Sequence, residues 1–364
     1  MVEHNGNLSG RLEQGETLPA SWYAAPAIFA LESDRILANT WQYVGHGGQV
    51  QSAGDFFTAQ LGRVPVVVTR DERGELHAMA NVCRHRGSEV VLDCAGNRKT
   101  LQCHYHGWTF NLDGTLRAAP RANEQPAFVK ENLSLVRFAV ETWGPMIFVN
   151  PAPAAGSLRE MIGRLPEVFD RAGIEVEKLK MVRRDVYDLA ANWKIIIENF
   201  NECYHCPIAH PKFSEVIDTE AYTSDIANEF FSSYHGPIIG APGASVNYAT
   251  LWPTAMFSIS RKPQAMQVLR VWPVDAGHTR ETVDYFFADD ATENQIRDYV
   301  EFSDLVQRED IVLCESVQRG LAAGVIDHGH LMLSRERGIQ HFQRLVYRFV
   351  SGEQQGQSSE IATR

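Results

Sequence analysis

The stretch Cys83–Trp108, CRHRGSEVVLDCAGNRKTLQCHYHGW, contains the pattern around which the remaining sequence is organised. It opens with a C-x-H pair, Cys83 and His85, and closes with a C-x-x-H pair, Cys103 and His106. Cysteine thiolates and histidine imidazoles are both common metal ligands. Each pair is too compact to form one face of a helix, so we expect two loop tips facing one centre. The stretch therefore predicts a metal site with four protein ligands.

Two kinds of metal centre suit these four ligands. A single zinc ion could bind all of them, although this order of cysteines and histidines is unusual for zinc. Disulfide bonds are a further alternative for the cysteines. A pair of irons divides the ligands by softness, with Cys83 and Cys103 on one iron and His85 and His106 on the other. The sequence favours the pair of irons.

Residues beside the four ligands strengthen this interpretation. Gly87 and Gly107 follow the two ligand pairs, and the aromatic residue Trp108 comes next. The stretch resembles the Rieske signature, and the resemblance implies a [2Fe–2S] cluster held by the two cysteines and two histidines. Cys94 and His104 fall outside the signature. We expect an unused thiol and a loop residue at these two positions.

Length and composition narrow the class of protein. The chain has 364 residues, 44% hydrophobic and 22% charged, which is typical of a globular protein of one or two domains. No apolar run approaches the ~18 residues of a membrane helix, and the polar start MVEHNGNLSG does not resemble a signal peptide. The net charge of −11 argues against nucleic acid and anionic membranes as partners.

The cysteines outside the metal pattern give an expectation about the cellular compartment. Cys94, Cys203, Cys206 and Cys314 show no spacing typical of a disulfide framework. Proteins without disulfides are typical of reducing compartments. The sequence therefore predicts a cytoplasmic protein without disulfide bonds.

The chain divides into four segments. Residues 1–40 form an N-terminal segment that we expect to pack on the catalytic domain, and residues 41–150 form a small β domain that carries the cluster loops. After the Pro- and Ala-rich linker that begins at Pro151, the catalytic domain covers residues 151–351. Residues 352–364 are polar, which predicts a disordered tail. The predicted fold class is α+β.

Periodicity predicts the main elements. Strands 64–68 and 146–149 belong to the β domain, and a short helix over 29–41 precedes it. The catalytic domain should contain an antiparallel sheet flanked by helices, an arrangement similar to the helix-grip fold. Its predicted helices are 158–172, 191–206 and 293–319, and its predicted strands are 182–189, 254–260, 264–272 and 281–287.

A second candidate site lies in Asn192–His210, NWKIIIENFNECYHCPIAH. At about 100° per residue, an apolar stripe of the predicted helix faces the core and leaves Glu202 and His205 on the opposite face. Pro207 cannot donate a backbone hydrogen bond, so we expect the helix to end just before it. The chain can then bend His210 back toward His205. Two neutral imidazoles would face one cation.

A carboxylate should complete this second metal site. The long helix 293–319 carries an apolar stripe, and Asp310 occupies its one missing position. The apolar members of the stripe are Phe302, Val306, Leu313 and Val317. A carboxylate on a buried stripe is costly unless it is paired or binds a metal. Asp310 is therefore the preferred third ligand, with Glu309 as second choice; a paired core aspartate is the alternative.

These segments together resemble the Rieske non-haem iron oxygenases, ring-hydroxylating type, catalytic α subunit. The pattern in Asn192–His210 and the block Glu309–Leu321 carry the resemblance. It implies a 2-His-1-carboxylate site for mononuclear Fe(II), made by His205, His210 and Asp310. It also assigns catalytic roles to residues of the pattern and the block; these are Asn199, Glu202 and Asp310.

The resemblance also implies partners. The family forms a head-to-tail homotrimer in which Glu202 would link His106 of one chain to His205 of the next. The sequence contains no P-loop and no dinucleotide-binding fingerprint. A separate NAD(P)H-dependent flavin or ferredoxin reductase must therefore supply the electrons. The other reactants are O2 and a small molecule.

The run Glu202–Pro207, ECYHCP, is similar to the branch that acts on quaternary amines. This similarity implies oxidative N-demethylation of a betaine-like compound. Aromatic residues attract quaternary ammonium groups, and the candidate pocket residues are Phe230, Phe231, Tyr234, Tyr248, Trp252 and Phe257. Two alternatives stay open: a hydroxylase or dioxygenase of an aromatic compound, and a Rieske electron-transfer protein without catalysis of its own.

Overall fold

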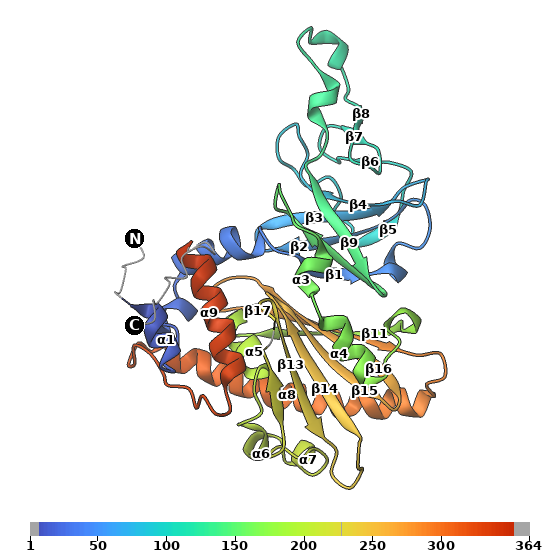
Figure 1. Cartoon of the computed structure of the whole chain (residues 1–364). Helices are drawn as coiled ribbons and strands as arrows, with labels where there is room; N and C mark the ends of the chain where they lie inside the picture. Colours follow the sequence, from blue (N-terminus) through green and yellow to red (C-terminus); the bar gives the residue numbers. More distant parts are fainter. Residues whose placement is uncertain (1–6, 227, 353–364) are drawn as a thin grey trace, which may run out of the picture.

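The computed structural model describes residues 7–226 and 228–352, and it shows two bodies in contact (Figure 1). A β domain forms the upper body, and a sheet covered by helices forms the lower one. The predicted α+β class is confirmed. The last twelve residues of the predicted disordered tail lie outside the described residues. Within the described part of the chain, no helix has the length and apolar character needed to cross a membrane.

The β domain consists of a seven-stranded sheet and a small three-stranded sheet. The large sheet has the order β1-β10-β9-β4-β3-β2-β5, and the paired strands are antiparallel. Its strands are β1 Gln42–His46, β2 Asp55–Leu61, β3 Val64–Arg70, β4 Leu76–Ala80, β5 Ala95–Asn97, β9 Arg137–Trp143 and β10 Met146–Asn150. The small sheet contains β6 Leu101–Gln102, β7 Thr109–Phe110 and β8 Leu116–Ala118. Strands β3 and β10 confirm the two predicted strands.

Short helical segments lie before the first strand and in the connections of the β domain. They are α1 Leu8–Glu13, η1 Ala20–Tyr23, α2 Pro26–Glu32, η2 Ser33–Leu37, η3 Gly47–Gln49, η4 Ala122–Glu124 and η5 Lys130–Leu133. The predicted helix 29–41 is wrong at both ends. It starts earlier because Pro26 suits the first turn of a helix, and it passes into the single π turn η2.

The catalytic domain is built on a second antiparallel sheet of seven strands, in the order β11-β17-β16-β15-β14-β13-β12. The strands are β11 Lys180–Leu189, β12 Thr223–Asp225, β13 Phe231–Pro237, β14 Ser245–Leu251, β15 Ala255–Arg261, β16 Gln264–Pro273 and β17 Thr279–Phe287. Four of these were predicted. The helices are α3 Leu158–Ile162, α4 Leu165–Ala172, η6 Val176–Lys178, α5 Trp193–Phe200, α6 Cys206–Ala209, α7 Pro211–Ser214, α8 Glu293–Ala322 and α9 Arg337–Ser351.

The two faces of this sheet have different partners. Phe169 of α4 packs edge-to-face on Phe257 of β15, with ring centroids 5.7 Å apart. Phe200 of α5 packs on Tyr248 of β14 at 5.8 Å. Tyr248 pairs with Ser258, the neighbour of Phe257, and successive residues of a strand point to opposite faces. Helices α4 and α5 therefore cover opposite faces.

Two predicted helices are shorter in the structure. The predicted helix 158–172 breaks at Gly163, whose φ of 49° ends α3 before α4 begins. The predicted helix 191–206 ends at Phe200. Pro207 lies in the first turn of the next helix, α6, so it starts a helix where we expected it to stop one.

Helix α8 buries a different face from the predicted one. Phe302 and Val317 of the predicted apolar stripe are 38% and 47% exposed. The buried residues of α8 are Val300, Gln307, Cys314 and Gln318. Two of these are glutamines with hydrogen-bond partners in the protein, which an apolar pattern cannot detect.

Candidate functional site

The two cluster loops have the same backbone geometry. The amide of Gly87 donates to the carbonyl of Cys83, and the amide of Gly107 donates to that of Cys103, each at 3.0 Å. Both glycines have positive φ, 79° and 72°, a conformation that costs other residues energy. The glycines of the Rieske signature therefore turn both loops so that the ligand pairs meet.

The structure brings the four predicted cluster ligands together, with the two cysteines inside and the two histidines at the surface. Cys83 and Cys103 are buried and carry free thiols, whereas His85 and His106 are exposed, with ring centroids 4.5 Å apart. Burial raises the pKa of the Cys83 thiol, and the adjacent Cys103 thiol raises it further. The indole of Trp108 stacks on His85 at 5.1 Å. Two inner thiols and two outer imidazoles fit a [2Fe–2S] pair with the histidine-bound iron toward the surface.

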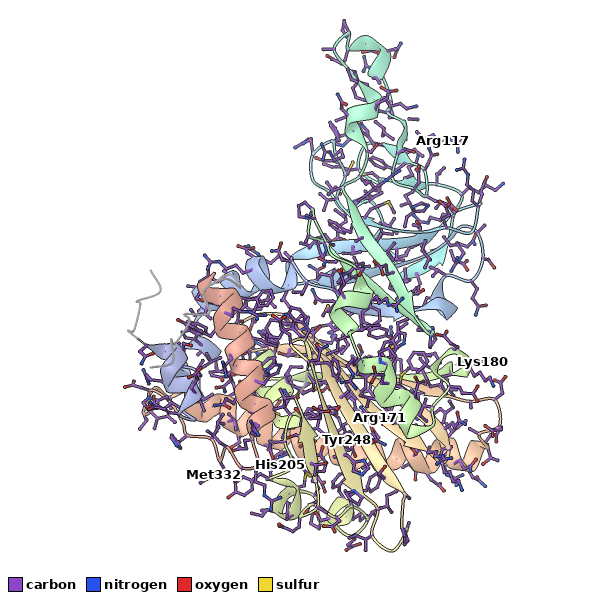
Figure 2. The ribbon with its side chains drawn as sticks, in the orientation of Figure 1. Arg117, Arg171, Lys180, His205, Tyr248 and Met332 are labelled. Atoms are coloured by element: carbon purple, nitrogen blue, oxygen red, sulfur yellow. A yellow bond between two sulfur atoms is a disulfide. The ribbon has the colours of Figure 1, made fainter. Side chains whose placement is uncertain are left out.

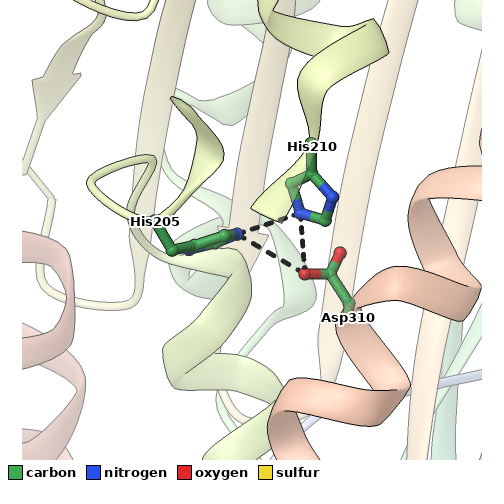
Figure 3. Close-up of side chains that lie close together, drawn as sticks. All are labelled: His205, His210 and Asp310. Atoms are coloured by element: carbon green, nitrogen blue, oxygen red, sulfur yellow. Dashed lines mark hydrogen bonds and ion pairs between the residues drawn. The ribbon is translucent and has the colours of Figure 1, made fainter. Parts of the chain in front are cut away.

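The second ligand set lies at the opposite end of the molecule, where α6 and α7 meet α8 (Figure 1). His210 Nε2 lies 3.1 Å from His205 Nε2 and 3.0 Å from Asp310 Oδ1 (Figure 3). His205 Nε2 lies 3.4 Å from the same oxygen. One atom from each residue can therefore reach a single ion. Two imidazoles and one carboxylate on one side match a non-haem Fe(II) triad that leaves open positions.

Local structure explains how residues five apart face one ion. Helix α6 is a single turn between His205 and His210, closed by the amide of His210 on the carbonyl of Cys206 at 2.9 Å. Cys203 and Cys206 form a disulfide that spans the loop before this turn. The expectation of a chain without disulfides is therefore wrong. The pair is a local C-x-x-C, which the lack of a long-range cysteine framework does not exclude.

Both histidines of the triad have a carboxylate on the outer ring nitrogen. Glu202 forms a hydrogen bond with His205 Nδ1 and also accepts a hydrogen bond from the backbone amide of Tyr204. Glu309 Oε2 lies 2.7 Å from His210 Nδ1, so the second choice for a ligand instead supports a ligand. Burial lowers the pKa of His205, but bonds to Asp310 and Glu202 outweigh it and raise the pKa to about 10.

A cavity of about 250 Å³ opens beside the triad, between the sheet and α8. Of the predicted pocket residues, Tyr248 lines this cavity. Asn199, which was predicted as a catalytic residue, lines it as well. Figure 2 labels Tyr248 and His205 in the same part of the lower body. The cavity walls also include aromatic residues that the sequence argument did not assign to the pocket; these are Phe200, Phe213, Tyr222, Tyr299 and Phe302.

The other predicted pocket residues lie elsewhere, which corrects those expectations. Phe230, Phe231 and Trp252 line a separate small cavity next to α9. Phe257 is fully buried on the opposite face of the sheet. The hydroxyl of Tyr234 bonds Ser232 at 2.8 Å, and this residue lines neighbouring surface cavities, not the one beside the triad.

A buried acid lies behind the cavity wall. Gln307 of α8 lines the cavity and donates Nε2 to Glu281 of β17 at 2.7 Å. Within the described residues, the other oxygen of Glu281 has no hydrogen-bond partner. Burial, followed by the charge of Asp310, raises the pKa of Glu281 to about 8. The acid is therefore largely neutral at neutral pH.

A cluster-binding β domain joined to a sheet with a 2-His-1-carboxylate triad defines a class: the Rieske-type non-haem iron oxygenases. A model of the Rieske [2Fe-2S] domain matches residues 40–134. A model of the ring hydroxylating α subunit, catalytic domain, matches residues 176–243 and 239–352. The chain belongs to this family, and its cofactors are a Rieske [2Fe–2S] cluster and a mononuclear iron.

Relatives of known activity cover almost the whole chain. The choline monooxygenase of Amaranthus tricolor is 32% identical over 91% of this chain and 77% of its own length. The carnitine monooxygenase oxygenase subunit of Acinetobacter pittii is 30% identical over 91% of this chain and 94% of its own. Both relatives are monooxygenases, and the similarity to each extends over almost the whole of this chain.

Solved structures show the same fold. A quaternary ammonium Rieske monooxygenase in complex with L-carnitine superimposes with a TM-score of 0.82 at 31% identity, covering 93% of this chain and 97% of that one. Naphthalene 1,2-dioxygenase superimposes with a TM-score of 0.76 at 20% identity, covering 92% of each chain. The second match establishes the fold alone.

Proposed function

We propose that this chain is the terminal oxygenase component that hydroxylates a quaternary ammonium compound, most simply on an N-methyl group. Cys83, His85, Cys103 and His106 hold the cluster, and the triad holds the mononuclear iron. When bound, that iron supplies the activation of O2 for insertion into a C–H bond. The alternative of an electron-transfer protein without catalysis has no use for the triad.

The reaction balances with two electrons and two protons. One oxygen atom of O2 converts N–CH3 to N–CH2OH, and the other leaves as water. The quaternary carbinolamine then breaks its C–N bond and gives a tertiary amine, formaldehyde and a proton. The electrons come from a separate NAD(P)H-dependent flavin or ferredoxin reductase.

The aromatic walls beside the triad carry the proposal. Tyr248 is in ring contact with Phe200 at 5.8 Å and with Tyr222 at 6.4 Å, and all three line the cavity with the triad. A quaternary ammonium cannot donate hydrogen bonds, so aromatic faces and nearby carboxylates are the groups that attract it. Relatives named for choline and carnitine support the same class of substrate.

Electron delivery is proposed to occur between chains of a head-to-tail homotrimer. The cluster loops and the triad of one chain lie at opposite ends of the molecule (Figure 1). His106 is exposed, and Glu202 already bonds His205. A related structure is described as revealing inter-subunit electron transfer. We therefore assign Glu202 as the link to His106 of the neighbouring chain, and Asn199 as a further catalytic residue; a cytoplasmic location stays part of the proposal.

The test is a substrate panel. The purified protein with a reductase and NAD(P)H is supplied with quaternary ammonium compounds or with aromatic hydrocarbons, and oxygen uptake and formaldehyde are measured. We expect uptake coupled to formaldehyde or to a hydroxylated product only with ammonium compounds. Uptake coupled to hydroxylated aromatics alone would reject the proposal in favour of the second candidate, an aromatic hydroxylase, which the same aromatic walls would suit.

A further inference from the structure

The charged residues that line the cavity are all acids or metal-binding histidines. Glu202 and Asp310 are the carboxylates, and His205 and His210 belong to the triad. The lining, which lies wholly within the described residues, includes no lysine and no arginine. A substrate carboxylate that entered this cavity would therefore find no lysine or arginine on its walls.

The mononuclear iron does not reverse this sign. An iron(II) ion held by the triad would bring two positive charges, but Asp310 would be one of its ligands, and Glu202 and Glu309 bond the outer nitrogens of the two histidines. Three carboxylates thus surround a divalent ion, so the site as a whole stays negative. An ammonium group is attracted there, and a second carboxylate is repelled.

Away from the triad, α8 lines the cavity with neutral polar side chains. Tyr299, Ser303, Gln307 and Asp310 all line it from that helix, and Asp310 lies roughly 16 Å along the axis from Tyr299 at 1.5 Å per residue. The hydroxyl of Tyr299 is buried and lies close to Ser258 of β15. The cavity therefore offers neutral donors and acceptors away from the triad.

The sheet supplies matching groups on the facing wall. Ser258 pairs with Tyr248 on one side and with Gln267 on the other, so the three side chains form a row on one face. All three line the cavity, and Ser260 lies two residues further along the same strand and face. Hydroxyl and amide groups can bond an uncharged polar group fully, but they do not neutralise a buried carboxylate.

We infer that the enzyme takes quaternary ammonium substrates whose second polar group is uncharged, such as an alcohol, in preference to zwitterions with a carboxylate. The inference rests on the proposed function and narrows it. The ammonium end lies among Phe200, Tyr222 and Tyr248 by the triad, and the neutral tail extends toward Tyr299. Ionised carboxylates are left outside because water solvates them better than these walls do.

Matched pairs of compounds test the inference. Each pair has the same chain length and ends in either a hydroxyl or a carboxylate: choline against glycine betaine, and the three- and four-carbon homologues. Methyl esters of the acids serve as neutral controls that keep the carbonyl group and are one methyl group larger. We expect kcat/KM from oxygen uptake to be at least tenfold higher for each alcohol than for its acid, with the esters closer to the alcohols.

Binding gives a readout independent of turnover. Titration calorimetry of the iron-loaded protein without O2 should show binding of the alcohols and at least tenfold weaker binding of the acids. Acids that bind and react as well as the alcohols would overturn the inference while the proposed function stands. If no compound of either series is oxidised, the proposed function fails and the inference fails with it.

A variant that adds a positive charge tests whether the lack of a cation on the cavity wall is the reason that acids are disfavoured. Ser260 lines the cavity and is partly exposed, so Ser260→Lys can place a cation on the wall, and Ser260→Met is the neutral control of similar length. We expect the ratio of kcat/KM for acid over alcohol to rise at least tenfold in Ser260→Lys and not in Ser260→Met. Iron content and melting temperature confirm that both variants are folded. An unchanged ratio in Ser260→Lys would overturn the inference.

Discussion

Glu202 and Glu309 determine how the two histidines face the metal. Each carboxylate bonds the outer ring nitrogen, which leaves Nε2 of His205 and of His210 as the metal-facing atom. Such partners fix the ring orientation and raise the basicity of the ligand. The sequence showed that both acids were near the site. The resemblance implied that Glu202 contacts His205, whereas Glu309 was expected only as a second-choice ligand, because the ring nitrogen that an acid reaches depends on the fold.

Glu309→Ala should weaken iron binding without removing a ligand. The loss of the bond to His210 Nδ1 frees the imidazole to rotate, and loss of such a partner typically costs about 10–100-fold in metal affinity. Competition with a chelator measures this affinity. Glu301→Ala, an exposed acid on the same helix, is the matched control and should bind iron like the parent. Equal affinity in Glu309→Ala would contradict the assigned role.

Glu202→Gln should separate metal binding from electron transfer. Glutamine keeps an oxygen that can accept the amide of Tyr204, so we expect both metal centres to load normally. Loss of the charge-assisted link should slow the reoxidation of the cluster in a single turnover by at least about tenfold, since such bonds are the strong ones. Stopped-flow absorbance follows the cluster. Reoxidation at the parental rate would exclude Glu202 as the link.

We expect the buried acid Glu198 to make the stability of the protein depend on pH. Burial raises its pKa to about 7, so the folded state favours the neutral acid. Its contribution to stability is full below the ordinary carboxyl pKa and is lost as the pH rises through about 7. In Glu198→Gln, an amide oxygen can still accept from Tyr23 and Gln343 but cannot ionise.

Between about pH 5 and about pH 8, the free energy of unfolding should therefore fall less in Glu198→Gln than in the parent, by on the order of 1 kcal/mol. Denaturant titrations at the two pH values measure the difference. Glu72→Gln, on an exposed turn, is the control and should follow the parent. If the free energy of unfolding depends on pH equally in Glu198→Gln and in the parent, then Glu198 is not the source of the pH dependence.

At the scale of elements, the α2–α5 contact holds the N-terminal segment on the catalytic domain. Lys194 of α5 and Glu32 of α2 are both fully buried and lie 2.6 Å apart. Lys194 also donates to the carbonyl of Trp22, and the indole of Trp193 donates to Glu32. The predicted packing of the N-terminal segment on the catalytic domain agrees with these contacts.

Lys194→Met should destabilise the protein strongly, because it leaves Glu32 as a buried charge without a cation. Breaking a buried ion pair from one side costs about 3–5 kcal/mol, whereas replacing both partners by apolar residues is often nearly neutral. The double variant Glu32→Leu with Lys194→Met should therefore be more stable than Lys194→Met alone. Unfolding curves of the three proteins measure this. A double variant less stable than the single one would contradict the account.

At this scale, the sequence allowed the metal ligand Asp310 to be predicted but not most of the walls of the aromatic pocket. Asp310 was predicted from an apolar stripe of α8 whose members Phe302 and Val317 are partly exposed in the structure, and the family block Glu309–Leu321 pointed independently to the same residue. The aromatic pocket was mostly missed because most of its walls come from α5, α7 and α8, and Phe257 was misplaced because it faces the side of the sheet opposite Tyr248. Register between strands is a non-local property that local periodicity does not contain.

At the scale of the whole molecule, a buried polar network joins the two bodies. The hydroxyl of Tyr43 on β1 donates to Asp284 on β17 at 2.5 Å, and Arg184 on β11 donates to both oxygens of that carboxylate. Arg270 on β16 donates to the carbonyl of Gln60 on β2 at 2.8 Å. The cluster domain is therefore held in one orientation on the catalytic sheet. Such an orientation is what repeated transfer to a neighbouring chain would require.

Iron analysis of the parent and of Asp310→Ala tests the central claim most directly. The account predicts three irons per chain in the parent. Asp310→Ala should retain two irons and the visible spectrum of the cluster, and it should lose oxygen uptake with every substrate. A variant that keeps three irons and the parental turnover, or a parent that holds only two irons and still oxidises its substrate, would contradict the account.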